Sequence, residues 1–303
     1  SRAVQARDVE TGALVCLKVM RHGKDYFDQG LDEIKLLRYV NDADPDDEQG
    51  ILRLLDSFYY KEHLVLVCEL LRANLYEFLK HNRLSGDEKY FAGPRLASVC
   101  HQVLRSLAFL HSLRLIHADL KPENILVKSY SRCRVKVIDL GSSCFLSDRL
   151  AVYVQSRSYR APEVVLGLPY DQRIDLWSLG CVAAELATGR VLMANESVPT
   201  LLARMHSILG PFPLAMLKKG RFAHKYFTKS GKIYERSAKT GRLEYLRPKQ
   251  SSLAARLAGL DPEFVSFVHS VLHLDPAQRP TAAQALEHPW LEQRRALPGA
   301  RSP

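Results

Sequence analysis

The chain has 303 residues, of which 47% are hydrophobic and 25% charged, with a formal net charge of +10. These values are typical of a globular protein and exclude a fibrous or low-complexity chain. No apolar run approaches the ~18–20 residues of a membrane span, so we expect no contact with a membrane interior. The six cysteines show no Cys-x-x-Cys spacing, which favours free thiols in an intracellular protein of the cytoplasm or nucleus.

Residues 1–71 are predicted to form a small lobe rich in strands. Two strands, AVQARDV and ALVCLKVM, flank a turn at Thr11-Gly12. Two more, ILRLLDSFYY and HLVLVCELL, follow the acidic stretch 41–49, which contains Pro45 and indicates a loop. Between the two pairs, helical spacing places four apolar residues on one face: Phe27, Leu31, Ile34 and Leu37.

Residues 72–292 are predicted to form a larger, mostly helical lobe, and residues 293–303 a tail. The stretch 175–188, DLWSLGCVAAELAT, is too apolar for a surface helix and should occupy the centre of this lobe. A long buried helix is indicated by apolar residues at helical spacing: Leu96, Val99, Cys100, Val103, Leu107 and Leu110. The expected fold class is therefore α+β with two lobes.

The segment from Ile116 to Leu140 reads IHADLKPENILVKSYSRCRVKVIDL. Phosphoryl transfer from a nucleotide needs a carboxylate to accept the hydroxyl proton, a cation near the migrating group and oxygen ligands for magnesium. The segment supplies these parts in chain order: Asp119, Lys121, Asn124 and Asp139. It resembles the catalytic loop and metal-binding motif of eukaryotic protein kinases. That resemblance implies ATP and Mg²⁺ as cofactors, Asp119 as base, and Asn124 and Asp139 as metal ligands.

The same resemblance implies the rest of an ATP site. Val15-Cys16-Leu17-Lys18 is similar to the V-A-I-K strand of kinases, with Cys16 in the place of alanine. Lys18 would bind the phosphates and pair with Glu33 on the next helix. Cys68 would be the gatekeeper, and the backbone from Glu69 to Leu71 would meet the adenine edge.

Three further residues are implied to be structural. Ala161-Pro162-Glu163 resembles the A-P-E motif that closes the kinase activation segment, and Arg279 is the expected partner of Glu163. A buried carboxylate needs such a partner, because an isolated charge there costs several kcal/mol. Asp175 should accept backbone hydrogen bonds from the catalytic loop. Together these features imply the two-lobed protein-kinase fold.

The segments GSSC, NLYEFL and VQSRSYRAPEVVLG resemble the dual-specificity tyrosine-phosphorylation-regulated kinases (DYRKs). In that family the kinase phosphorylates its own tyrosine at the position of Tyr153, and the phosphate pairs with arginines that map to Arg157 and Arg160. Ala151 replaces the first tyrosine of the family motif. The insert that begins LLARMHSILG resembles the plant and green-algal branch.

The resemblance has three departures. We expect the glycine-rich phosphate loop to precede Ser1. Ala118 stands where most kinases have arginine, so control by phosphorylation should run through Arg157 and Arg160. Leu140 replaces the phenylalanine of Asp-Phe-Gly and should pack in its place.

The resemblance also implies an ATP-dependent serine/threonine protein kinase of the dual-specificity type that acts on protein substrates, with a preference for proline after the target residue. Lys121 belongs to the serine/threonine form of the catalytic loop, and Arg160 resembles the arginine of proline-directed kinases. Glu123 is either a subsite for an arginine upstream of the target or a surface carboxylate at a helix start.

Two other functions remain as alternatives: a catalytically silent pseudokinase scaffold and a basic nucleic-acid-binding protein, which the absence of a nucleic-acid module disfavours. Much of the positive charge lies in residues 218–249, which form either a solvated insert or a docking site for acidic partners. Only Glu235 and Glu244 oppose eleven basic residues there: Lys218, Lys219, Arg221, Lys225, Lys229, Lys232, Arg236, Lys239, Arg242, Arg247 and Lys249.

Overall fold

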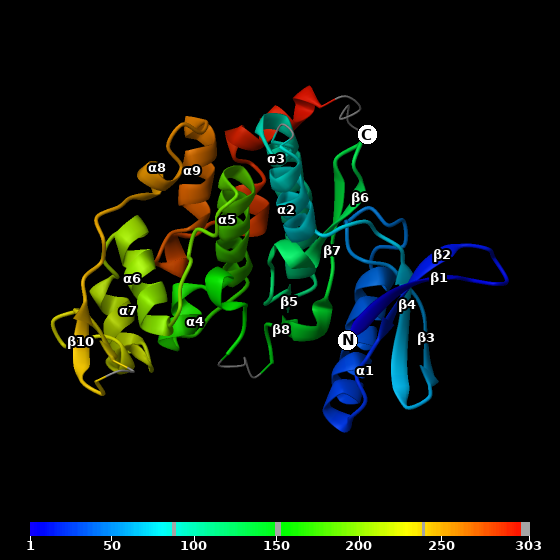
Figure 1. Cartoon of the computed structure of the whole chain (residues 1–303), viewed down its shortest axis with the longest axis horizontal. Helices are drawn as coiled ribbons and strands as arrows, with labels where there is room; N and C mark the ends of the chain where they lie inside the picture. The colour runs from blue at the N-terminus through cyan, green and yellow to red at the C-terminus, as the bar shows by residue number, and fades with distance from the viewer. Residues whose placement is uncertain (87–88, 149–152, 238–239, 298–303) are drawn as a thin grey trace.

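The computed structural model describes residues 1–86, 89–148, 153–237 and 240–297, which form two lobes (Figure 1). The smaller lobe is a four-stranded antiparallel sheet in the order β1-β2-β4-β3 with one helix. Its elements are β1 (Arg2–Arg7), β2 (Leu14–Val19), α1 (Lys24–Asp42), β3 (Leu54–Tyr60) and β4 (His63–Glu69).

The β1–β2 hairpin turns as the sequence predicts. The Asp8 carboxylate accepts hydrogen bonds from the amides of Glu10 and Thr11, and Gly12 takes a left-handed φ of 72°. Helix α1 buries Ile34 and Leu37, but the predicted apolar face is wrong at Phe27. That ring is exposed and contacts the exposed ring of Tyr59 edge to face instead of packing in the core.

The larger lobe contains nine α-helices within the described residues. They are α2 (Leu75–Ser85), α3 (Gly93–Ser112), α4 (Pro162–Leu166), α5 (Arg173–Thr188), α6 (Val198–Leu209), α7 (Leu214–Lys219), α8 (Leu253–Arg256), α9 (Pro262–Val271) and α10 (Ala282–Ala285). Short 3₁₀ helices are η1 (Pro122–Asn124), η2 (Leu140–Ser142), η3 (Arg157–Tyr159), η4 (Ala223–Lys225), η5 (Pro276–Gln278) and η6 (Pro289–Ala296).

Three antiparallel strand pairs complete the larger lobe. They are β5 (Leu115–Ile116) with β8 (Cys144–Phe145), β6 (Ile125–Ser129) with β7 (Arg134–Val137), and β9 (Ile233–Arg236) with β10 (Leu243–Leu246). The first two pairs lie beside the smaller lobe in Figure 1, whereas β10 lies at the far end of the molecule. The β5–β8 and β6–β7 pairs therefore bring the catalytic segment to the junction of the lobes.

Helix α5 is the centre of the larger lobe, as its apolar sequence predicts. Every residue from Ile174 to Ala187 is buried, and α5 packs against α3 and α9.

Helix η6 continues past residue 293, where the sequence predicts a tail. Leu297 packs on the core, and residues 298–303 lie outside the described part of the chain. Trp290 and Leu291, at the end of the predicted larger lobe, are buried in the core.

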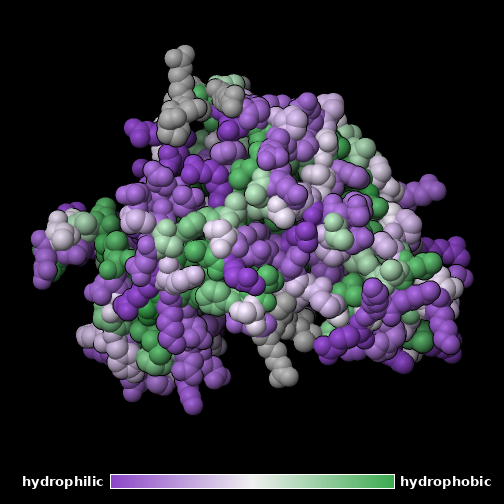
Figure 2. Space-filling view, turned by 180° about the vertical axis from the view of Figure 1, so that it is seen from behind, coloured by the Kyte–Doolittle hydropathy of each residue, from purple (hydrophilic) through white to green (hydrophobic). Residues whose placement is uncertain are grey.

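Hydrophilic residues predominate on the face seen in Figure 2, with hydrophobic residues interspersed among them. Within the described residues, no helix has both the length and the apolar character that crossing a membrane requires. The cysteines are all free thiols, four of them buried.

Candidate active site

A charged triad lies where the two lobes meet. Lys18 extends from β2, Glu33 from α1, and Asp139 from the residue before η2. The Lys18 Nζ atom lies 2.6 and 2.8 Å from the two carboxylate oxygens of Glu33 and 3.1 Å from Asp139 Oδ1. The structure thus brings together three predicted site residues that are remote in sequence.

Burial and charge oppose one another in this triad. Burial alone would lower the pKa of Lys18, but the carboxylates of Glu33 and Asp139 outweigh it and raise this pKa. Burial would raise the pKa of Asp139, but Lys18 lowers it below its ordinary value. Burial prevails only at Glu33, whose pKa is raised despite Lys18. At neutral pH Lys18 is therefore a cation and Asp139 an anion, and the Asp139 side chain remains 39% exposed.

The carboxylate of Asp119 is held in a fixed orientation. Its Oδ2 atom accepts a hydrogen bond from Lys121 Nζ at 2.7 Å. Its Oδ1 atom accepts from the amide and the hydroxyl of Ser156 at 2.9 and 2.8 Å. Lys121 Nζ also lies 3.1 Å from Ser156 Oγ. Ser156 is a functional candidate that the sequence does not single out, since one serine in a serine-rich loop carries no chemical signature.

Asn124 and Asp139 fit the donor set of a magnesium ion. The Asn124 amide donates from Nδ2 to the carbonyl of Asp119 at 2.9 Å, which orients its oxygen as the group offered to a cation. The amide of Ile138 donates to the carbonyl of Asn124, and this joins η1 to the residue before Asp139. In the described part of the chain, no three His, Cys, Asp or Glu side chains gather as metal ligands. Two oxygen donors suit Mg²⁺, which takes few protein ligands and shares phosphate oxygens.

Asp175 supports the catalytic loop from the buried start of α5. Its carboxylate accepts hydrogen bonds from the amides of His117 and Ala118, both at 2.9 Å, and lies 3.0 Å from His111 Nε2. Burial would raise the pKa of Asp175, but the hydrogen bond and charge of His111 lead the contributions that lower it. Ala118 has a left-handed φ of 63°, and its bond to Asp175 offsets the cost of that conformation.

The predicted hinge residues follow β4. Cys16 on β2 is in register with Cys68 on β4, and burial raises the pKa of Cys68 to about 12. Both thiols are therefore neutral at physiological pH, since burial also raises the pKa of Cys16. Leu71 lies in the linker between β4 and α2, which the Arg72 amide ties to the carbonyl of Val127 at 2.9 Å. The Glu69 carboxylate accepts a hydrogen bond from the amide of Arg53 at 2.9 Å.

Two arginines lie close to the exposed ring of Tyr153. The Arg160 guanidinium carbon is 3.7 Å from the ring centroid, and Arg160 also donates to the carbonyls of Val154 and Gln155. A hydrogen bond from Arg160 and its charge, with a smaller contribution from Arg157, lower the pKa of Tyr153. Arg157 donates to the carbonyl of Glu196 at 3.0 Å. Ala151 lies outside the described residues.

Glu163 and Arg279 form a fully buried, bidentate ion pair. Arg279 NH1 lies 2.7 Å from Glu163 Oε1, and NH2 lies 3.1 Å from Oε2. Arg279 also donates to the carbonyls of Arg173 and His273 and lies over the Trp177 ring. Leu140, the predicted apolar replacement beside Asp139, is fully buried.

The basic segment 218–249 is anchored by its apolar residues. Phe227 and Ile233 are buried, whereas every described Lys and Arg of the segment is exposed; Lys239 lies outside the described residues. Glu235 receives a hydrogen bond from Ser197 at 3.3 Å. The structure therefore presents these charges to solvent, at the end of the molecule remote from the triad (Figure 1).

The chain is similar to known protein kinases. The protein kinase domain family model matches residues 1–291. A probable serine/threonine-protein kinase, dyrk2, of Dictyostelium discoideum is 40% identical over 96% of this chain and 31% of its own length. Dual specificity tyrosine-phosphorylation-regulated kinase 3 of Rattus norvegicus is 38% identical over 91% of this chain and 49% of its own length.

A third relative, dual specificity tyrosine-phosphorylation-regulated kinase 4 of Homo sapiens, is 37% identical over 96% of this chain and 55% of its own length. The chain thus spans between 31% and 55% of the length of these three relatives. A solved kinase-domain crystal structure superposes with a TM-score of 0.84 at 28% identity, covering 96% of this chain and 91% of that one. The chain therefore belongs to the protein kinase domain family, whose members are ATP-dependent phosphotransferases, and has DYRK kinases among its homologues.

Proposed function

We propose that this protein transfers the γ-phosphoryl group of ATP to serine or threonine hydroxyls of protein substrates, as a DYRK-type kinase. The observation that carries the proposal is the arrangement around Asp119. Its carboxylate is fixed by Lys121 and Ser156 and is joined through Asn124 to the segment that ends at Asp139. This is the set of groups that phosphoryl transfer needs, in one place.

Each side chain has a role that follows from its contacts. Asp119 accepts the proton of the substrate hydroxyl, and Lys121, bound to Asp119, stabilises charge on the migrating phosphoryl group. Lys18, anchored by Glu33, holds the α- and β-phosphates. Asn124 and Asp139 would hold Mg²⁺, which neutralises phosphate charge when bound.

A radiolabel transfer assay tests the proposal. The protein is incubated with Mg²⁺, labelled ATP and a generic protein substrate. Label on serine or threonine supports the proposal, whereas nucleotide binding without transfer would instead favour the pseudokinase scaffold. A salt-dependent gel shift with nucleic acid, in the absence of transfer, would favour the nucleic-acid-binding alternative.

We propose further that Tyr153 is an autophosphorylation site. The ring is 71% exposed, and Arg160 and Arg157 are positioned beside it. A phosphate of about −2 charge there would gain charge-assisted hydrogen bonds from both guanidinium groups and would fix the segment. Tandem mass spectrometry of protein made with and without an intact Asp139 tests this proposal: phosphate on Tyr153 should appear only with the intact residue.

The proposed substrate has proline after the target residue and arginine before it. Arg160 already satisfies the carbonyls of Val154 and Gln155, which removes backbone acceptors near the site and suits a residue without an amide proton. The Glu123 Oε2 atom is buried and has no hydrogen-bond partner within the described residues, so it offers an acceptor for a cationic side chain. A peptide library with varied flanking residues would reveal both preferences.

We propose that the segment 218–249 docks acidic partners, because its basic side chains are exposed and lie away from the catalytic residues. Neutralising Lys218 and Lys219 together should weaken binding to an acidic peptide without altering transfer to a short neutral one.

We also propose that the protein belongs to the plant or green-algal branch of the DYRK family and that it is located in the cytoplasm or nucleus. Branch-specific alignment and imaging of the tagged full-length protein test these two proposals.

A further inference from the structure

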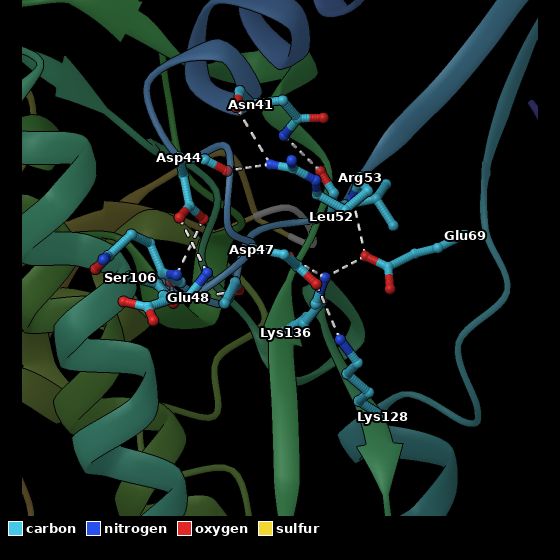
Figure 3. A network of polar contacts seen from close by, with 12 residues as sticks. Asn41, Asp44, Asp47, Glu48, Leu52, Arg53, Glu69, Ser106, Lys128 and Lys136 are labelled. Atoms are coloured by element: carbon cyan, nitrogen blue, oxygen red, sulfur yellow. Dashed lines mark hydrogen bonds and ion pairs between the residues drawn. The ribbon is translucent and has the colours of Figure 1, made fainter. Parts of the chain in front are cut away.

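Lys136 on β7 is a buried cation outside the catalytic residues. Its side chain is 2% exposed, and its Nζ atom lies 2.5 Å from Asp47 Oδ1 and within hydrogen-bonding distance of Glu69 Oε1 (Figure 3). Lys128 binds the other oxygen of Asp47 at 2.9 Å from a more exposed position. Burial opposes the ionisation of Asp47, but hydrogen bonds from Lys136 and Lys128 lower its pKa. A buried ammonium is maintained only where such partners meet it with good geometry.

Lys136 and its two partners belong to three separate segments. Asp47 lies in the loop that follows α1, and Glu69 is the last residue of β4, where the linker between the lobes begins. Lys136 itself stands three residues before Asp139. Figure 3 shows these side chains converging between the β6–β7 pair and the end of β4. The network therefore connects the start of the hinge to both lobes.

The main chain around Glu69 is fixed on two sides by this network. The amide of Glu69 donates to the carbonyl of Arg53 at 3.1 Å, and the amide of Arg53 donates to the Glu69 carboxylate at 2.9 Å. The guanidinium of Arg53 in turn donates to the carbonyl of Asp44 at 2.6 Å. Lys136 completes the set by neutralising the Glu69 carboxylate. Without it, the partly buried carboxylates of Glu69 and Asp47 would have no shared counter-charge.

We propose that Lys136 is a positioning residue for nucleotide binding: it clamps Glu69 to β7 and so holds the main chain from Glu69 to Leu71 where the adenine edge binds. This inference rests on the proposed kinase function. Adenine is remote from the transferred phosphoryl group, so its contacts are the same in the ground state and the transition state. Loss of such uniform binding raises KM for ATP and leaves kcat nearly unchanged.

The test measures binding of adenosine and of ATP with Mg²⁺ by calorimetry, together with kcat and KM, for Lys136→Met. We expect affinity for both ligands to fall about tenfold, with kcat within about twofold of the parent. Lys128→Met is the matched control, because Lys128 binds the same Asp47 but is 42% exposed and makes no contact with Glu69 among the described interactions. Its affinities should stay within about twofold of the parent.

Adenosine separates the possible outcomes because it lacks phosphates. If Lys136→Met weakens ATP with Mg²⁺ but not adenosine, the lysine acts through Asp139 and the proposal is overturned. Unchanged KM with a lower melting temperature would also overturn it, since the salt bridge would then be purely structural. Should Lys136→Met not fold, Glu69→Gln removes the same clamp and must weaken adenosine similarly. A parent chain that binds no adenosine would instead overturn the proposed function itself.

Discussion

The pairs Lys18–Glu33 and Glu163–Arg279 have nearly the same length, 2.6 and 2.7 Å, but they differ in what surrounds them. Beyond its bonds to Glu163, Arg279 donates hydrogen bonds to the carbonyls of Arg173 and His273. The side chains of Glu163 and Arg279 are almost fully shielded from solvent. Lys18 is 21% exposed and shares its charge with Asp139, a second carboxylate that solvent can reach.

This difference distinguishes an ion pair that can serve catalysis from one that only stabilises the fold. The two pairs have nearly equal lengths, so length does not distinguish them. A closed pair has all of its donors and acceptors satisfied by the protein, whereas an open one keeps a charged group available to a ligand. Glu163–Arg279 is closed and fastens α4 to the segment before α10, while the Lys18 triad is open toward the junction of the lobes.

The largest expected effect comes from Asp139→Asn. Asparagine tolerates the left-handed φ of 66° at this position, so the backbone should remain in place. Loss of the anion removes the proposed metal ligand, and phosphoryl transfer should fall by at least about 10²-fold. Labelled ATP and a protein substrate give the rate, and circular dichroism melting checks the fold.

The control for Asp139→Asn is Asp148→Asn, which changes a surface carboxylate that caps the amide of Phe145. That variant should keep transfer within about threefold of the parent. Equal activity of Asp139→Asn and the parent would contradict the open character of the triad.

Glu163→Gln should produce the opposite pattern. The substitution leaves the Arg279 guanidinium buried without its counter-charge, which costs about 3 kcal/mol in the free energy of unfolding. Catalytic groups are untouched, so the rate per folded molecule should change by less than about threefold. Urea unfolding, read beside the transfer rate on the folded fraction, checks both expectations. A large loss of rate with unchanged stability would contradict a purely structural role for the Glu163–Arg279 pair.

Both ion pairs could be predicted from the sequence, because their residues stand in motifs with fixed spacing. Lys18, Glu33 and Asp139 lie far apart in sequence, and the resemblance to kinase motifs implies their association, whereas strand and helix periodicity predict only the elements that carry Lys18 and Glu33. The apolar run of 175–188 likewise predicts the buried helix α5. The two-lobed fold follows from strands before residue 71 and helices after it, and the observed elements have this order.

The sequence did not predict the roles of Ser156, Asp47 and Lys136, because their contacts form only when segments remote in sequence come together in the folded chain. Ser156 reaches Asp119 only because Gln155, with a left-handed φ of 66°, hydrogen bonds from its amide to the carbonyl of Ala118. The acidic run 41–49 is indeed largely a loop, but nothing in its composition shows that Asp47 meets Lys136. The prediction for Phe27 was wrong for a related reason: helical spacing gives the face of a helix but not which residues of that face the core covers.

A smaller effect is expected from Tyr153→Phe. This variant tests whether a third ion pair forms between phosphorylated Tyr153 and the guanidinium groups of Arg157 and Arg160. Phenylalanine keeps the ring over Arg160 but cannot carry a phosphate. Activity should fall about fivefold to tenfold, because the segment loses the charge-assisted bonds to Arg157 and Arg160. Steady-state rates on a peptide substrate give the measurement. A variant as fast as the parent would exclude Tyr153 from control of the site.

The smallest effect concerns pH and depends on Glu33. Burial raises the pKa of Glu33 above its ordinary value of about 4.3, while Lys18 holds the pKa of Asp139 below its own. As pH falls, Glu33 is therefore protonated first and releases Lys18, so kcat/KM should decline while Asp139 is still ionised. A raised carboxyl pKa means that the folded state binds this proton more tightly than the unfolded state, so protonation of Glu33 does not favour unfolding. Activity should thus be lost at a higher pH than the circular dichroism signal, and a simultaneous loss of both would show that Glu33 behaves as a member of a closed pair.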